Sequence, residues 1–244
     1  MRNLRLDICY DGTRYKGWQR LPGSANTIQS KIEATLSRIL GEDVEIVGSG
    51  RTDAGTHARM QVANVHCHSN MPCDEILENL RRYLPEDIGI YSCRNVSERF
   101  HARLNAKTKT YLYRIWNSQQ PCVFERRFVH MDPTKFDLDR MQCAADQLVG
   151  THDFSAFCAN KNMKKSTVRC IHKFQISRVG YEIHFTVTGN GFLHHMVRIM
   201  VGTLLEVGMG QREPDSMQTL FGQERAQAGM LVPSCGLCVM EVDY

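Results

Sequence analysis

The chain has 244 residues, of which 42% are hydrophobic and 23% charged, a balance typical of globular proteins with a substantial core. No apolar run approaches the roughly 18 residues that a membrane span needs. The charged N-terminal stretch MRNLRLDICYDG is unlike a signal peptide, so we expect a cytoplasmic protein without a membrane segment. The net charge of +4 at pH 7 is too small to indicate a nucleic-acid-binding protein by itself.

The first hundred residues predict strands and helices that do not alternate regularly. Residues 3–10 alternate as a half-buried strand, and residues 26–40 carry apolar side chains at helical spacing, with Asn26 as the expected N-cap. Further strands are expected at 45–47, 61–68 and 88–96, and a second helix at 73–85. The irregular order favours an α+β fold with antiparallel sheets over a doubly wound parallel sheet.

The second half repeats this organisation. Strands are expected at 107–117, 170–179, 181–189 and 236–244, and helices at 136–150 and 192–208. Asn190 and Gly191 are candidates for the start of the last helix, on which His194 and His195 would point about 100° apart and make a poor metal pair. We therefore predict two similar α+β lobes, residues 1–103 and 104–244, with no metal site.

Basic residues concentrate in two segments: Arg99, His101, Arg103, Lys107, Lys109 and Arg114, and then Lys161, Lys164, Lys165 and Arg169. Either group alone is what a solvated basic face would look like. Two such groups in a chain with a candidate catalytic loop favour a polyanionic partner.

The ten cysteines are scattered through the expected strands and helices, which favours reduced thiols over a disulfide framework. Cys235 and Cys238 form one C-x-x-C pair, but no second pair of ligands and no thioredoxin-like context accompanies it.

The candidate catalytic loop is GSGRTDAG, residues 48–55. Its glycines allow positive φ angles and close approach of a ligand. If the chain is extended from Arg51 to Asp53, both side chains project to the same side. A carboxylate held near a guanidinium can act as a nucleophile, but an Asp that caps a turn, with Arg51 in a surface ion pair, fits the spacing equally well.

Several motifs in order resemble the tRNA pseudouridine synthase TruA family. The stretch GRTDAGTHA is similar to the family signature GRTDAGVHA, and KTYLYRI at 109–115 is similar to its K/R-x-Y-x-Y strand. Similar blocks run along the whole chain: YDGTRYKGWQR at 10–20, FHAR at 100–103, DFSAF at 153–157, GNGFLHHMVRIMVGTLLEVG at 189–208 and GLCVMEVDY at 236–244.

The resemblance implies two lobes of antiparallel sheet with helices packed on one side and a central cleft. It implies that Asp53 is the catalytic aspartate and that Arg51 displaces the target base. It further implies that Tyr111 stacks on the uracil, Arg198 pairs with the aspartate and Leu237 lines the pocket. The implied substrate is tRNA at uridines 38 to 40 and the implied assembly is a homodimer, with no cofactor.

Two positions depart from the family pattern. Thr56 replaces the usual valine, and Cys238 stands where an aromatic residue usually follows the leucine. The segment 158–168 has no family pattern, so no role is carried onto it. Its basic character leaves open a ribosomal RNA substrate for the same chemistry, and a non-catalytic RNA-binding or folding factor is the third hypothesis. The sequence does not distinguish attack of Asp53 at C1′ of the ribose from attack at C6 of the base.

Overall fold

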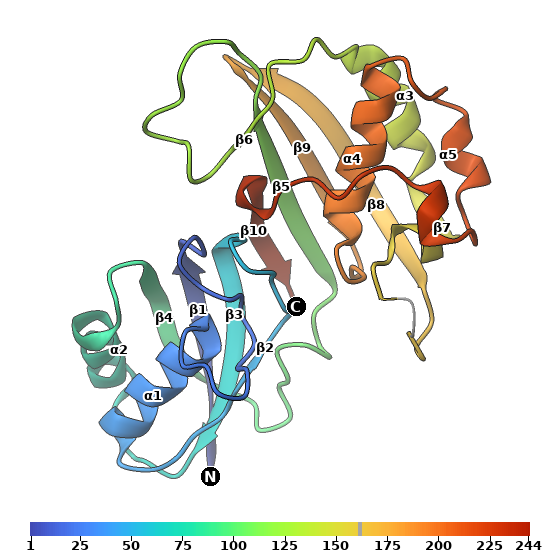
Figure 1. Ribbon diagram of the computed structural model, residues 1–244. Coiled ribbons are helices and arrows are strands. Elements are labelled where there is room, and N and C mark those ends of the chain that lie inside the picture. Colours follow the sequence, from blue (N-terminus) through green and yellow to red (C-terminus); the bar gives the residue numbers. More distant parts are fainter. Residues whose placement is uncertain (161–162) are drawn as a thin grey trace. The chain divides into compact units, whose positions relative to one another are not determined.

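The computed structural model describes residues 1–160 and 163–244 and shows a mixed α+β protein, which confirms the predicted fold class (Figure 1). The chain forms two compact units. Unit 1 comprises Met1–Lys107 together with Val239–Tyr244, and unit 2 comprises Thr108–Cys238.

The sheet of unit 1 has the order β4 (Ile88–Val96), β1 (Arg2–Tyr10), β3 (His57–Cys67) and β10 (Leu237–Asp243), and β2 (Ile46–Gly48) also pairs with β3. Strand β10 belongs to unit 1 from Val239 onward, and its first two residues belong to unit 2. Strand β1 runs antiparallel to both of its neighbours. The alternation in the sequence is explained by burial, because Leu4, Leu6 and Ile8 are completely buried while the residues between them are partly exposed.

Helices α1 (Ile28–Leu40) and α2 (Cys73–Tyr83) lie next to each other against this sheet (Figure 1). The expectation that Asn26 caps α1 is wrong. Thr27 is the N-cap, and its hydroxyl accepts a hydrogen bond from the backbone N–H of Ser30. The Asn26 side chain instead donates to the carbonyl of Arg14 and so holds the turn that follows β1.

The sheet of unit 2 has the order β5 (Thr108–Trp116), β9 (Glu182–Gly189), β8 (Val168–Val179) and β7 (Gly150–Asp153), all antiparallel. The short strand β6 (His130–Met131) runs parallel to the end of β5. Strands β8 and β9 form the predicted hairpin, in which Gly180 has the positive φ of 59° that a two-residue loop requires.

Three helices lie in the described part of unit 2: α3 (Leu138–Gln147), α4 (Met196–Gly208) and the single turn α5 (Ser216–Thr219). Single 3₁₀ turns, η1 to η3, occupy Ser155–Phe157, Arg225–Gln227 and Ser234–Gly236. Nearly every residue of α4 is buried, which accounts for its uniformly apolar sequence. The helix begins at Met196, so the expected start at Asn190 and Gly191 is wrong; the Asn190 side chain accepts a hydrogen bond from the backbone of Cys170 instead.

The last residues of the chain group with unit 1, whereas the sequence placed them in the C-terminal lobe. The Tyr244 hydroxyl donates to the Ala102 carbonyl over 2.7 Å, and the Arg5 guanidinium lies 4.6 Å from the Tyr244 ring. The Lys107 N–H also donates to the Asp243 carbonyl. Among the residues the structure describes, no helix has the length and apolar character that crossing a membrane requires.

Candidate active site

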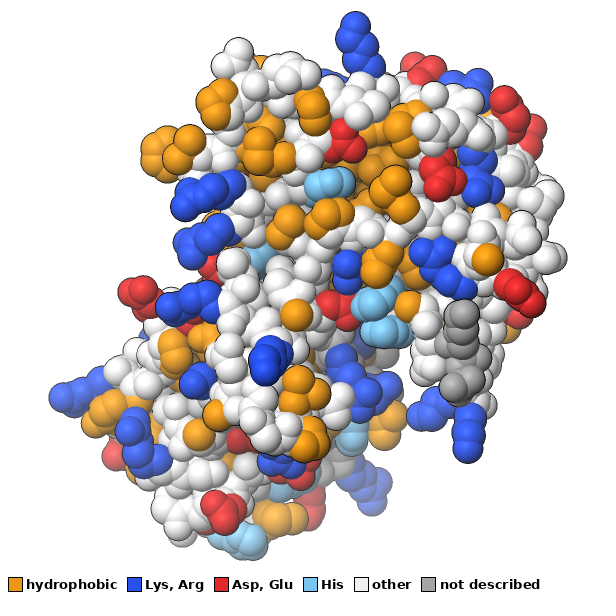
Figure 2. All heavy atoms as spheres, viewed as in Figure 1, with side chains coloured by type: hydrophobic (Ala, Val, Ile, Leu, Met, Phe, Trp, Pro, Cys, Tyr) orange, Lys and Arg blue, Asp and Glu red, His pale blue; other side chains and the backbone are white. Residues whose placement is uncertain are grey.

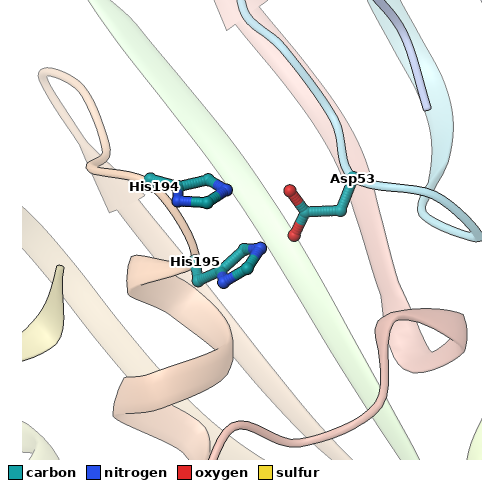
Figure 3. Close-up of side chains that lie close together, drawn as sticks. All are labelled: Asp53, His194 and His195. Atoms are coloured by element: carbon teal, nitrogen blue, oxygen red, sulfur yellow. The ribbon is translucent and has the colours of Figure 1, made fainter. Parts of the chain in front are cut away.

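Residues 49–56, here called the Asp53 loop, connect β2 to β3 in unit 1 (Figure 3). The backbone N–H of Ser49 donates to the Val62 carbonyl over 2.7 Å, and the Gln61 side chain donates to the Gly50 carbonyl over 3.0 Å. At the other end, the Thr56 N–H donates to the Asp53 carbonyl over 3.1 Å and closes a turn. Gly55 has a φ of 77°, a left-handed conformation that favours glycine at this position of the turn.

The segment 10–18, which starts at the last residue of β1, fixes the middle of the Asp53 loop. The Tyr10 and Thr52 hydroxyls share a hydrogen bond of 2.8 Å, and the Trp18 N–H donates to the Thr52 carbonyl over 3.0 Å. Gly12 and Gly17 permit this contact, because a Cβ would lie 2.0 Å from the Thr56 oxygen at Gly12 and 2.6 Å from the Thr52 oxygen at Gly17.

These contacts orient the loop side chains. Thr52 is buried against Tyr10, whereas its neighbours on either side are accessible: Arg51 is exposed and Asp53 half-buried. The inward Thr52 between two outward residues is the alternation of an extended segment. Asp53 is therefore partly exposed on a loop whose backbone is held at both ends and in the middle, which fixes its position as a reactive group requires.

Tyr111 lies on β5 in unit 2 opposite Val187 of β9, and only 9% of its surface is exposed. The ring of Phe192 packs against it edge-on, with the two ring centroids 4.9 Å apart. Phe192 therefore fixes the plane of the Tyr111 ring, a contact that the sequence did not predict.

Arg198 lies in the first turn of α4, and its Nε donates to the Val232 carbonyl over 2.8 Å. The next residue along, Pro233, accepts a hydrogen bond of 2.8 Å from the Tyr113 hydroxyl of β5. Burial raises the pKa of Tyr113, so this hydroxyl stays protonated and donates. The segment that leads to Leu237 is thus bonded to both α4 and β5.

Gly236 completes this arrangement, since a Cβ there would lie 2.7 Å from the Arg114 carbonyl and 2.9 Å from the Tyr113 ring. Leu237, the next residue, is 7% exposed. Unit 2 therefore brings Arg198 and Leu237 to the strand that carries Tyr111, while Arg51 and Asp53 belong to unit 1.

His194 and His195 precede α4, so the expectation that they lie on the helix and point apart is wrong (Figure 3). His195 is the N-cap and has a φ of 63°, in the left-handed region. This conformation brings the two rings over each other, with centroids 3.7 Å apart and planes 32° apart. A left-handed residue that is not glycine is uncommon, and such strain is concentrated at functional sites.

Within either unit taken by itself, the described residues contain no group of three His, Cys, Asp or Glu side chains close enough to hold a metal ion. The ten cysteines are free thiols. Cys235 of the C-x-x-C pair donates to the Val129 carbonyl, and burial raises the pKa of its thiol.

The two basic segments differ from the expected open clusters. Arg114 is not available as a surface charge, because its guanidinium is paired with Glu182 at 2.7 Å and with Glu125 at 3.0 Å. In the second segment, Lys164 and Lys165 are exposed, whereas Arg169 donates to the carbonyls of Ser166 and Val168. Lys161 lies outside the described residues.

Comparison with known proteins identifies a family. A family model described as tRNA pseudouridine synthase matches residues 8–105 and 144–244. A protein of Bacillus sp. (strain KSM-64) named tRNA pseudouridine synthase A is 49% identical over 94% of both chains. Proteins of Clostridium tetani and Bacillus cereus, named tRNA pseudouridine synthase A 1 and A 2, are 44% and 43% identical over the full length of both chains.

Among solved structures, that of a Cbf5–Nop10–Gar1 complex matches 97% of this chain and 48% of its own, at 11% identity and a TM-score of 0.41. The family assignment therefore depends on the family model and the sequence relatives.

Proposed function

The chain belongs to the tRNA pseudouridine synthase family, and from this premise we propose that it isomerises uridines 38 to 40 of tRNA with Asp53 as the nucleophile. The observation that carries the proposal is the position of Asp53, partly exposed on a loop fixed by Tyr10, Gly12, Gly17 and Trp18. A turn-capping aspartate needs no such support from a second segment of chain.

The reaction exchanges one bond between sugar and base for another. The bond from C1′ to N1 of the uracil breaks, the base turns, and a bond from C1′ to C5 forms while C5 loses a proton and N1 gains one. Nothing is oxidised or reduced. A paired base must first leave the stack, at a cost of a few kcal/mol, and we assign this displacement to Arg51.

The other proposed site residues hold the uracil base and stabilise the ionised carboxylate. Tyr111, held edge-on by Phe192, presents a ring on which the uracil stacks, and Leu237 contributes an apolar wall. Arg198 contributes the positive charge that keeps the attacking carboxylate ionised. In this proposal Asp53 attacks either C1′ or C6, and both routes require the same ionised carboxylate.

The decisive experiment is a pseudouridine map of unmodified tRNA and ribosomal RNA transcripts after treatment with the wild type, Asp53→Ala or Asp43→Ala. Asp43 is exposed and serves as the matched control. We expect signal at tRNA positions 38 to 40 with the wild type and Asp43→Ala, and a loss of at least about 10⁴-fold with Asp53→Ala.

Other outcomes of the map contradict parts of the proposal. Signal confined to ribosomal RNA would overturn the substrate and keep the chemistry. Tight RNA binding without any product would indicate a binding factor. The proposal also includes a homodimer, which sedimentation at micromolar concentration tests directly.

A further inference from the structure

His57, the first residue of β3, is the one buried histidine of the chain. All ten histidines lie within the described residues, and Figure 2 shows several histidine side chains at the surface, whereas His57 is 4% exposed. Burying an imidazole costs free energy unless its ring nitrogens have hydrogen-bond partners. The contacts of this ring therefore indicate why a histidine occupies the position.

The ring of His57 extends the contact between β1 and β3 beyond the end of their ladder. The backbone pairing ends where Tyr10 lies opposite Ala58. Two residues later, the buried Gly12 donates its N–H to Nδ1 of His57 over 3.0 Å. The Thr56 carbonyl, in the peptide bond that precedes His57, also meets Gly12, since a Cβ on Gly12 would lie 2.0 Å from its oxygen. Gly12 is thus held at two points by the end of the Asp53 loop.

The direction of this hydrogen bond defines the protonation state of the ring. The Gly12 N–H is a backbone donor that cannot turn away, so Nδ1 presents its lone pair and the neutral ring carries its proton on Nε2. Oδ1 of Asp11 lies 3.2 Å from the same ring nitrogen and accepts the Thr13 N–H over 3.0 Å. A proton on Nδ1 would be donated to Asp11 and would leave the buried Gly12 N–H without its acceptor. The neutral form of His57 is therefore the form that holds Gly12.

The loop end that Gly12 meets is bonded directly to Asp53. The Thr56 N–H donates to the Asp53 carbonyl over 3.1 Å, so a shift of Thr56 moves the turn that begins at Asp53. On the other side of Asp53, the hydroxyls of Tyr10 and Thr52 share a hydrogen bond of 2.8 Å. Asp53 therefore lies between two contacts with segment 10–18, and His57 maintains one of them.

We propose that His57 is a positioning residue for the reaction, whose neutral ring holds Gly12 against the end of the Asp53 loop and so fixes the reacting carboxylate. His57 does not touch the substrate in this proposal. Loss of a positioning contact slows the chemical step, whereas loss of a contact that only stabilises the fold lowers the Tm and leaves the rate of the folded protein unchanged. The inference rests on the proposed function, because it takes Asp53 as the reacting group.

The test uses side chains that follow the same path from Cα to the atom facing Gly12 and differ in whether that atom accepts a hydrogen bond. His57→Asn places Oδ1 where the wild type has Nδ1, and His57→Leu places a methyl group there. His66→Leu, at an exposed position of the same strand, is the matched control.

The rate constant for pseudouridine formation in a single turnover on a tRNA transcript, together with the Kd for that transcript, is measured for each variant. We expect His57→Leu to lower the rate constant about 10- to 50-fold and to change Kd by less than about 2-fold. We expect His57→Asn to remain within about 3-fold of the wild-type rate constant, because the acceptor is retained, and His66→Leu to have no effect. The expectation for His57→Asn stands whether or not His57→Leu folds, which circular dichroism shows.

A second measurement requires no turnover. Hydrogen exchange of the peptides that cover residues 10–18 and 49–56, read by mass spectrometry, should be about 10-fold faster in His57→Leu than in the wild type and near the wild type in His57→Asn. Unchanged exchange in His57→Leu would overturn the proposal, and so would an equal loss of rate in His57→Asn and His57→Leu. If the wild type forms no pseudouridine on any RNA while the exchange rates follow this expectation, the failure lies in the proposed function and not in the contact that His57 makes.

Discussion

Asp53 and Arg198 are the two charged residues to which the proposal gives the central roles. They are held in place by different kinds of contact. Asp53 lies on a loop held by backbone hydrogen bonds and by glycines that allow two segments of chain to touch. Arg198 lies on a helix buried on nearly every side, and one carbonyl, that of Val232, fixes its Nε. The Asp53 loop should therefore be sensitive to a single added methyl group, while the Arg198 helix should tolerate changes at the charge itself.

Among substitutions outside the proposed catalytic residues, the largest effect should come from Gly12→Ala. Its Cβ would lie 2.0 Å from the Thr56 carbonyl oxygen, so the backbone three residues from Asp53 must move. We expect turnover on tRNA to fall about 100-fold or more, as for a displacement of about 1 Å at a reacting group, and the free energy of unfolding to fall by about 1–3 kcal/mol.

Gly41→Ala is the matched control for this change. Gly41 ends α1 with a φ of 69°, and a Cβ there would meet nothing within 4 Å. It should cost about 1 kcal/mol of stability and leave turnover intact. Equal turnover in the two variants would show that the contact between Gly12 and the Asp53 loop has no part in positioning the carboxylate.

Arg198→Met should lower kcat about 100-fold. The buried helix should keep the protein folded, while the loss of the hydrogen bond to the Val232 carbonyl costs about 1–3 kcal/mol of stability. Arg212→Met is the control, since Arg212 pairs with Glu206 of the same helix at 3.0 Å and has no proposed role in the reaction. Steady-state kinetics measures the turnover of the two variants, and circular dichroism measures whether they remain folded. Near-normal turnover of Arg198→Met would refute the proposed role of its charge in keeping the attacking carboxylate ionised.

A smaller effect is expected from Glu182→Gln, which changes the sheet of unit 2 away from Arg198. Burial raises the pKa of Glu182, but hydrogen bonds from Arg114 and His184 outweigh it and hold the pKa below its ordinary value. The carboxylate therefore stabilises the fold above its unfolded pKa, and this stability is lost as the pH falls through the lower folded pKa.

We expect Glu182→Gln to cost about 1–2 kcal/mol at pH 7, and the difference from the wild type to shrink at acid pH. Thermal unfolding of the wild type and the variant from pH 3 to pH 7 measures the stability difference at pH 7 and its change with pH. Glu213→Gln, which affects an exposed pair with Arg140, should cost less than about 0.5 kcal/mol at any pH. A pH-independent difference for Glu182→Gln would contradict the assigned ion pair.

The contrast between these regions also explains what the sequence could predict. Strands and helices followed from periodicity: Leu4, Leu6 and Ile8 are buried as their alternation predicts, and α3 buries Met141 and Ala145. The start of α4 did not follow, because an apolar run continues through residues that the left-handed His195 excludes from the helix. Local periodicity carries no information on such a backbone reversal.

The contacts that hold the Asp53 loop could not be predicted from the sequence, for a different reason. The glycines of segment 10–18 are visible in the sequence, but their partner, the backbone of Thr52 and Thr56, becomes known only when β1 and β3 pair. The pairing of Arg114 with Glu182 and Glu125 likewise joins residues 68 and 11 positions apart. Charge counting placed Arg114 in a basic cluster because it treats every arginine as solvated.

The smallest predicted effect has the opposite sign, and it concerns one of the two positions where this chain departs from the family pattern. Thr56 is 1% exposed, and its hydroxyl has no hydrogen-bond partner among the described residues. Thr56→Val replaces the buried hydroxyl by a methyl group of nearly the same volume, so it should raise the free energy of unfolding by about 1 kcal/mol and the Tm by about 2–4 °C.

Thr203→Val is the matched control. The Thr203 hydroxyl donates to the Ile199 carbonyl and accepts from the Gly229 N–H, so its loss should destabilise the protein by about 1–3 kcal/mol. If Thr56→Val destabilised the protein as Thr203→Val does, the Thr56 hydroxyl would have a hydrogen-bond partner in solution, and its presence at the end of the Asp53 loop would then be a feature of the site.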